Sequence, residues 1–284
     1  MQNPYNQREP IRNPAFFYGR SQEAGQTLNQ VKHLQSVSLV GPPRIGKTSL
    51  LHYLAQPSVL AQHNLDPARY IFPFMDCSRL GKPGQADIFR LMLDQVLAGL
   101  TETELELDLA NIPASGPLSY QELLDGLEII TEADQKVIFL FDRFEGMSQN
   151  PKLDAGFYSG LRGLAGELNL AYVTTSNHSL FDLTYSEGIL GSPFFNIFTT
   201  IRLGLLTEVE ARSLIAAPAR AAGLAFSEPT IAFILSLAGR HPDNIQLACY
   251  HAFELQARQG ELQDADYNRL RQQLGPRMAA GSNN

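Results

Sequence analysis

Residues 41–48, GPPRIGKT, follow the pattern GxxxxGK[ST]. A phosphate-binding loop needs backbone N–H groups that converge on phosphate oxygens, and Gly41 and Gly46 allow the close approach and unusual dihedral angles that this requires. An apolar run, SVSLV, precedes the loop and a leucine-rich helical pattern follows it, which is the context that the motif needs. We therefore predict a nucleotide-binding loop in which Lys47 reaches the β- and γ-phosphates and Thr48 coordinates Mg²⁺. Its residues are Gly41, Pro42, Pro43, Arg44, Ile45, Gly46, Lys47, Thr48 and Ser49.

A second group with possible chemistry lies in VIFLFDRFEG, residues 137–146. Five apolar residues precede Asp142, which places its carboxylate at the carboxyl end of a buried strand, where ligands bind in parallel sheets. Asp142 is therefore predicted to hold the metal together with Thr48. The next position, where a glutamate that activates water often stands, carries Arg143. Glu145 is the nearby substitute, so the catalytic base is either displaced to Glu145 or absent.

A third group ends the apolar run in LAYVTTSNHS, residues 170–179. Consecutive hydroxyl and amide side chains at a strand end are suited to sensing a γ-phosphate. The candidates are Thr175, Ser176 and Asn177. The same residue types also cap strand ends, and the sequence leaves both interpretations open.

Strand-like and helical segments alternate over the first 204 residues. We expect strands at 36–40, 69–76, 137–142, 170–176 and 196–203, and helices at 21–34, 48–55, 85–100, 119–133 and 154–168. The central strands are continuously apolar, as expected when both faces of a sheet are covered. This alternation predicts an α/β fold with a mostly parallel, doubly wound sheet.

Strands disappear from the pattern after residue 203. Thr207 and Glu210 have the spacing of a capping box, and further helices are expected near 229–239, 243–259 and 263–274. At the other end, three prolines predict an extended arm over residues 1–15. We expect an α/β core with its N-terminal arm at 1–204, a small helical lid domain at 205–276 and a disordered tail at 277–284.

Bulk properties narrow the class of protein. The 284 residues are 44% hydrophobic, enough for a full core, and the net charge of −7 disfavours non-specific binding to nucleic acid or anionic membranes. Cys77 and Cys249 show no metal-ligand spacing, so we expect buried free thiols. The polar N-terminus lacks a signal core, and the longest apolar stretch, 231–239, is about half of a membrane span. A soluble, cytoplasmic protein is expected.

Together these motifs resemble a known family. NPAFFYGR, GPPRIGKTSLL, VIFLFDRFE, LAYVTTS, SPFFNIFTTIRLGLLTEVEARSLI and GRHPDNIQLACYHAFE are similar to segments of the STAND branch of P-loop ATPases. Within that branch the chain resembles bacterial and archaeal AAA-like ATPases, relatives of NACHT and NB-ARC switches and of origin-recognition ATPases. The resemblance covers about residues 13–258. It implies a P-loop NTPase core with a helical lid, and ATP or ADP with Mg²⁺ as cofactors.

The resemblance also implies further site residues. In such ATPases one segment lies over the adenine. It is matched here by Tyr18, Gly19 and Arg20 together with the preceding phenylalanine. In the lid motif at 239–242, Pro242 matches a proline that packs near the base, and His241 either approaches the phosphates or has no ligand role; Arg240 is similarly open. No NKxD tetrapeptide of the guanine-reading type occurs, so adenine is expected over guanine.

Arg162 lies where such ATPases often place an arginine that faces a neighbouring subunit. The alternative for Arg162 is a solvated guanidinium on a helix surface. Two departures from the family pattern imply slow turnover: Arg143 replaces the second acid, and Asn177 stands where many relatives have arginine.

The resemblance therefore favours an ATP-dependent molecular switch that self-associates when ATP binds, plausible in bacterial conflict or defence. An effector or sensor module is not visible, so the chain is either part of a longer protein or works with separate partners. Nucleic acid and membranes are not expected as partners. The alternatives are a DNA-linked ATPase of origin-recognition or transposition type, and a scaffold that holds nucleotide without turnover.

Replacing Lys47 by alanine is expected to abolish ATP binding. No other lysine lies near the loop in the sequence to neutralise the β- and γ-phosphates. Isothermal titration calorimetry of Lys47→Ala checks this, and an affinity equal to that of the wild type would contradict the assignment of the loop.

Overall fold

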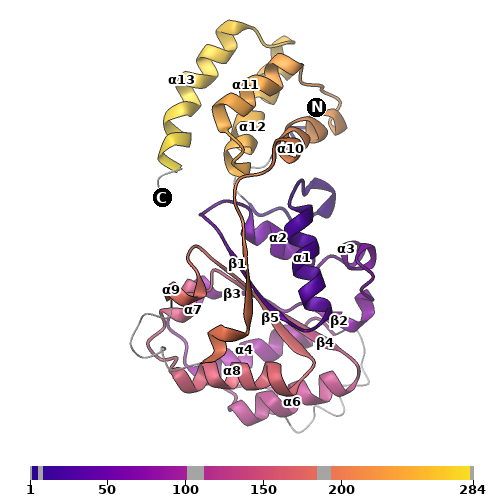
Figure 1. Ribbon diagram of the computed structural model, residues 1–284, viewed down its shortest axis with the longest axis vertical. Coiled ribbons are helices and arrows are strands. Elements are labelled where there is room, and N and C mark those ends of the chain that lie inside the picture. Colours follow the sequence, from indigo (N-terminus) through magenta and orange to yellow (C-terminus); the bar gives the residue numbers. More distant parts are fainter. Residues whose placement is uncertain (1, 6–8, 101–111, 184–192, 282–284) are drawn as a thin grey trace. The chain divides into compact units, whose positions relative to one another are not determined.

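The chain folds as two compact units. The computed structural model describes residues 2–5, 9–100, 112–183 and 193–281 (Figure 1). One unit, here called the sheet unit, comprises Glu23–Gly41 and Leu54–Arg202. The other, the helical unit, comprises Met1–Gln22, Pro42–Tyr53 and Leu203–Asn284. The N-terminal arm and the phosphate-binding loop from Pro42 onward, which we had placed in the α/β core, thus group with the C-terminal helices, whereas Gly41 groups with the sheet.

A parallel sheet organises the sheet unit (Figure 1). The strand order is β2–β4–β5–β1–β6, β3 also pairs with β4, and every pair is parallel. Because β5 separates β1 from β4, the strand that leads into the loop is not adjacent to the strand that ends in Asp142. The strands are β1 (Ser36–Val40), β2 (Tyr70–Ile71), β3 (Phe74–Asp76), β4 (Lys136–Asp142), β5 (Leu170–Ser176) and β6 (Phe198–Arg202).

Helices cover both faces of this sheet, which confirms the predicted fold class. Side chains alternate along β4: Val137, Phe139 and Phe141 join the apolar core contributed by α4, α6 and α8. Ile138 and Leu140 are equally buried and point to the opposite face. Figure 1 shows α4, α6 and α8 gathered on one side of the sheet and α1 on the other. The helices of this part are α1 (Ser21–Lys32), α3 (Pro57–Gln62), α4 (Gln85–Leu97), α6 (Tyr120–Glu132), α7 (Glu145–Ser148), α8 (Ala155–Glu167) and α9 (Leu180–Leu183).

Two expected strands differ from the structure. The segment predicted as one strand over 69–76 is divided into β2 and β3. Pro73 has no N–H to donate and only accepts, through its carbonyl, a 2.8 Å hydrogen bond from the Leu140 N–H, so the ladder is interrupted there. The strand predicted from 196 begins at Phe198, since Pro193–Ile197 forms a 3₁₀ turn.

The helical unit contains α2 (Lys47–Leu54), α10 (Glu208–Ala221), α11 (Glu228–Ala238), α12 (Pro242–Gln259) and α13 (Asp264–Gly281). The predicted capping box is present at the start of α10. The tail expected to be disordered from 277 instead continues α13 to residue 281, and 282–284 lie outside the described residues. Leu270, Leu274 and Met278 are buried at four-residue intervals, so one apolar face extends the helix into the tail. No described helix is both long and apolar enough to cross a membrane.

The N-terminal arm packs into the core of the helical unit. Tyr5 is 3% exposed, and its ring lies 6.2 Å from the rings of both Phe226 and Phe253. Its hydroxyl donates to the carbonyl of Ile215, and the Asn3 amide donates to the carbonyl of Tyr250 at 3.1 Å. The polar composition of the N-terminal arm did not predict this packing, because it depends mainly on the single aromatic side chain of Tyr5. Residues 1 and 6–8 of the arm lie outside the described residues.

Candidate nucleotide-binding site

The phosphate-binding loop joins β1 to α2. Arg44 and Gly46 have φ angles of 60° and 101°, the left-handed conformations that turn successive N–H groups toward one side of such a loop. Ile45 is fully buried and anchors the turn, while α2 begins at Lys47. The Lys47 ammonium donates to the carbonyl of Pro42 at 2.9 Å, so the side chain folds back over its own loop. The conformation therefore has the curved backbone and the inward lysine that a phosphate site needs.

A buried arginine holds the loop in place. Arg20 is 4% exposed, and its guanidinium donates to the carbonyls of Ile45, at 3.2 Å, and of Gly204. The Arg20 N–H donates to the Glu210 carboxylate at 2.6 Å. Gly19 precedes it with φ of 82°, and a Cβ there would lie 3.1 Å from a Leu206 methyl group, so glycine suits this turn. Arg20, predicted as a nucleotide contact, thus lies at the loop as a brace on its backbone.

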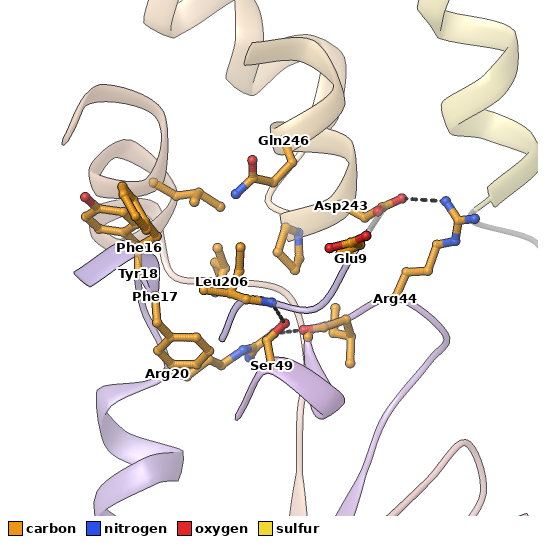
Figure 2. A pocket seen from close by; sticks show the side chains of 15 residues that line it. Glu9, Phe16, Phe17, Tyr18, Arg20, Arg44, Ser49, Leu206, Asp243 and Gln246 are labelled. Atoms are coloured by element: carbon orange, nitrogen blue, oxygen red, sulfur yellow. Dashed lines mark hydrogen bonds and ion pairs between the residues drawn. The ribbon is translucent and has the colours of Figure 1, made fainter. Parts of the chain in front are cut away.

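A pocket opens beside the loop within the helical unit (Figure 2). Aromatic side chains from the arm form one wall, and Phe17 stacks on Tyr53 of α2 with ring centroids 4.4 Å apart. The apolar walls and the adjoining loop suit a planar base attached to phosphates. The pocket is lined by Glu9, Ile11, Phe16, Phe17, Tyr18, Arg20, Arg44, Ile45, Gly46, Ser49, Leu206, Leu214, Pro242, Asp243 and Gln246.

The lid motif at 239–242 meets the loop in the same unit. Pro242 lines the pocket, and His241 immediately precedes it as the residue before the first turn of α12. Burial lowers the pKa of His241, which favours the neutral imidazole. One residue further on, Asp243 forms an ion pair with Arg44 at 3.2 Å. The start of α12 therefore meets the loop, through the Asp243–Arg44 ion pair and with Pro242 at the pocket.

Asp142 lies at the carboxyl edge of the sheet, as predicted. It is 2% exposed, and its Oδ1 accepts a 2.6 Å hydrogen bond from the Thr175 hydroxyl. That hydroxyl in turn accepts from the Arg143 N–H at 2.9 Å. The Gly41 N–H donates to the Ser176 carbonyl at 3.2 Å, so the end of β1 adjoins the end of β5. The metal-ligand candidate and the start of the loop thus share one edge of the sheet.

Arg143 turns its guanidinium onto two acids at this edge. It adopts a left-handed conformation, with φ of 56°, and donates to Asp76 at 2.6 Å. Its Nε lies 3.7 Å from Oδ2 of Asp142. Sequence reasoning missed Asp76, although FMD ends β3 as LFD ends β4, and that shared pattern was a usable signal. A cation therefore stands beside the carboxylate that is expected to hold the metal.

Glu145 lies near the strand ends because the chain turns at Arg143, just before α7 begins at Glu145. Its carboxylate accepts a hydrogen bond from the backbone N–H of Asn177, the residue after β5. Gly146 permits this turn, since a Cβ there would lie 2.2 Å from the Cys77 carbonyl. The Glu145 carboxylate thus lies at the end of β5, and its role as a catalytic base stays a prediction.

Cys77 and Cys249 are buried free thiols, as expected, and burial, followed by the nearby Asp142 charge, raises the pKa of Cys77.

The remaining candidates occupy different environments. Thr175 is engaged by Asp142, and the Ser176 hydroxyl donates to the His178 carbonyl at 2.6 Å, whereas Asn177 is exposed. Arg162 is exposed on α8. Their proposed sensing and intersubunit roles stay predictions.

The residue types predicted as metal ligands are those that magnesium prefers. Mg²⁺ prefers oxygen ligands, and Asp142 and Thr48 carry a carboxylate and a hydroxyl oxygen. When bound, the ion would neutralise phosphate charge. The role of the two side chains as metal ligands stays a prediction.

The sheet, the loop and the acid at the strand edge define a P-loop ATPase of the STAND and AAA-like class. The family model described as Novel STAND NTPase 2 matches residues 31–275, and the chain belongs to this family. Members of such a family bind nucleotide. No curated protein sequence matched the chain.

Solved structures share this fold. The Walker-type ATPase of Pyrococcus abyssi is 16% identical with a TM-score of 0.62, over 94% of this chain and 73% of that one. The ADP form of the Aeropyrum pernix ORC2 protein is 14% identical with a TM-score of 0.62, over 94% and 71% of the two chains. Domain III of the Thermotoga maritima replication initiation protein DnaA is 14% identical with a TM-score of 0.56, over 92% and 96%. At these identities the likeness concerns the fold alone.

Replacing Thr175 by valine is expected to destabilise the protein by about 1.5–3 kcal/mol. Valine keeps the shape but removes the donor to a buried carboxylate and the acceptor for the Arg143 N–H. Urea unfolding at neutral pH measures the loss.

Thr174→Val is the matched control on the same strand. Thr174 is fully buried, but its hydroxyl has no hydrogen-bond partner among the described residues, so valine should be neutral or stabilising. If both variants lost the same free energy of unfolding, the Thr175–Asp142 hydrogen bond would not contribute specifically to stability.

Proposed function

We propose that the protein is an ATP-dependent molecular switch that hydrolyses ATP slowly and changes its association state with the nucleotide bound. Membership of the family supports nucleotide binding. The observation that carries the proposal is that, within the helical unit, the start of α12 meets the phosphate-binding loop: Pro242 and Gly46 line the same pocket, and Asp243 pairs with Arg44 at 3.2 Å. A nucleotide bound in this pocket would contact the loop and α12 together, so it would favour whichever arrangement of the two lets it make both contacts.

Adenine nucleotide with Mg²⁺ is the proposed ligand. The aromatic and aliphatic pocket beside the loop supports a base at this position. Lys47 and the loop N–H groups would bind the phosphates, and Thr48 with Asp142 would hold the metal. The ion pair of Arg44 in the loop with Asp243 would transmit a change in loop conformation to α12.

The position and contacts of Arg143 support the proposal that ATP hydrolysis is slow. The guanidinium occupies the sequence position of the usual second acid, pairs with Asp76, and lies near Asp142. Glu145 is at the sheet edge but its carboxylate is engaged by the Asn177 N–H. A general base must be free to accept a proton from water, so this contact has to loosen before Glu145 acts.

Self-association on ATP binding, a separate effector or sensor, and a role in bacterial conflict or defence complete the proposal. A DNA-linked activity is the second candidate, because the similar structures include the Aeropyrum pernix ORC1 protein in complex with DNA, with 12% identity and a TM-score of 0.56. The net charge of −7 opposes it. Binding to duplex DNA that weakens steeply with salt would favour this candidate over the switch.

Adding ATP and Mg²⁺ to the purified protein is expected to increase its mass in solution. The expected cause is that bound nucleotide selects an arrangement competent to associate. Light scattering after size exclusion, with the nucleotide content of each peak identified, measures this, and Lys47→Ala is the control that should not respond. An unchanged mass for the wild type would contradict switching by association, and unhydrolysed ATP retained through purification would favour a scaffold without turnover.

Glu145→Gln is expected to slow ATP hydrolysis roughly 10²-fold while ATP binding is retained, if Glu145 is the base. Glutamine keeps an oxygen that can accept from the Asn177 N–H, so the fold of α7 is preserved. If the base is instead absent, Glu145→Gln has no effect and Arg143→Glu raises the rate.

Arg143→Glu both removes the guanidinium and adds a carboxylate. Arg143→Ala separates these two changes, because it removes the guanidinium without adding an acid. Phosphate release at saturating ATP measures all three variants. A wild-type protein that hydrolyses ATP rapidly and is indifferent to Glu145→Gln would contradict both versions.

A further inference from the structure

Gln246 places an amide at the pocket with an atom that the protein leaves without a partner. It lies on α12 one turn after Pro242, so the two side chains share the helix face that lines the pocket. Its Oε1 is buried and has no hydrogen-bond partner among the described residues. Figure 2 shows the amide extending from α12 toward the pocket, above Leu206. A buried acceptor without a donor costs free energy, which a bound ligand can recover.

Several other polar groups around the pocket are engaged by the protein itself. The Ser49 hydroxyl accepts from the Ile11 N–H at 3.0 Å. Arg44 is paired with Asp243, and Arg20 donates to backbone carbonyls. Gln246 is therefore well placed to contact the edge of a base that lies between the apolar walls.

We infer that Gln246 recognises the 6-amino group of a bound adenine; this inference rests on the proposed function and assigns a residue to base recognition. An amide carries one acceptor and a pair of donors, the complement of adenine, whose 6-amino group donates and whose neighbouring ring nitrogen accepts. Gln246 thereby makes the pocket select for the exocyclic group of the base, while the loop binds phosphates common to all nucleotides.

The test compares ATP with purine riboside 5′-triphosphate, which lacks only the 6-amino group. Competition titrations are run with the full chain as wild type and as Gln246→Met, which keeps the length of the side chain but removes both hydrogen-bonding groups. The wild type is expected to bind ATP about tenfold more tightly than the analogue, the size of one good amide–adenine contact. Gln246→Met should bind the two alike, with ATP weakened to the level of the analogue.

Gln256→Met is the matched control. Gln256 lies on the same helix and also has a buried Oε1 without a partner among the described residues, but its amide donates to the Ala225 carbonyl and it does not line the pocket. It should keep the full preference for ATP. Circular dichroism checks that each variant is folded; if Gln246→Met is not, Gln246→Asn, which withdraws the amide by one methylene, replaces it with the same expected loss of preference.

A wild-type protein that binds ATP and the analogue equally overturns the inference whatever the variants do, as does a Gln246→Met variant that keeps the wild-type preference. Both results leave the nucleotide switch intact. Failure of the wild type to bind ATP at all would instead remove the proposed function, so the two failures are distinguishable.

Discussion

A buried carboxylate must be compensated, and Asp142 imposes that condition on the edge of the sheet. Removing an ion from water costs several kcal/mol unless hydrogen bonds or opposite charges replace the solvent. Thr175 supplies the hydrogen bond, and its position on β5 follows from the parallel register of β4 and β5. The Arg143 N–H completes the chain of donors, which requires the left-handed turn immediately after β4. That turn leads directly into α7 and so determines where Glu145 lies.

A second buried charge organises the helical unit in the same way. The Arg20 guanidinium has the carbonyls of Ile45 and Gly204 as acceptors, which join the loop to the segment that precedes α10. Burial alone would raise the pKa of Glu210, but hydrogen bonds from Thr207 and from the Arg20 N–H outweigh that effect. The pKa is therefore lowered overall, and the carboxylate stays ionised. The arm, the loop and α10 are consequently held by one set of charge-assisted contacts. This accounts for the loop belonging to the helical unit, although it is continuous in sequence with β1.

Sequence patterns were sufficient for most of the helices and strands and for the position of Asp142 at the carboxyl edge of the sheet. The apolar runs before Lys47 and Asp142 predicted both strands and the carboxyl edge, because a buried parallel strand has few alternative interpretations. They did not predict α7, a single turn that needs glycine at position 146 because a Cβ there would lie 2.2 Å from the Cys77 carbonyl, 69 positions away in the sequence. Gln246 was equally invisible, since its significance is an unpartnered atom in a folded pocket. The tail was mispredicted because its small residues hid the spacing of Met278 with the leucines before it.

Arg143 also affects how strongly a nucleotide could favour one state of a switch. Moving a two-state equilibrium from 1:99 to 99:1 requires about 5.5 kcal/mol of differential binding, and contacts made equally in both states contribute nothing. A charged hydrogen bond is worth about 1.5–3 kcal/mol, so a few such contacts are sufficient. The Arg143 guanidinium pairs with Asp76 and its Nε lies 3.7 Å from Oδ2 of Asp142, so it competes with a metal ion for the carboxylates at this edge. On the proposed function, the residue that departs most from the family pattern therefore lowers the binding free energy that a metal-bound nucleotide can gain there.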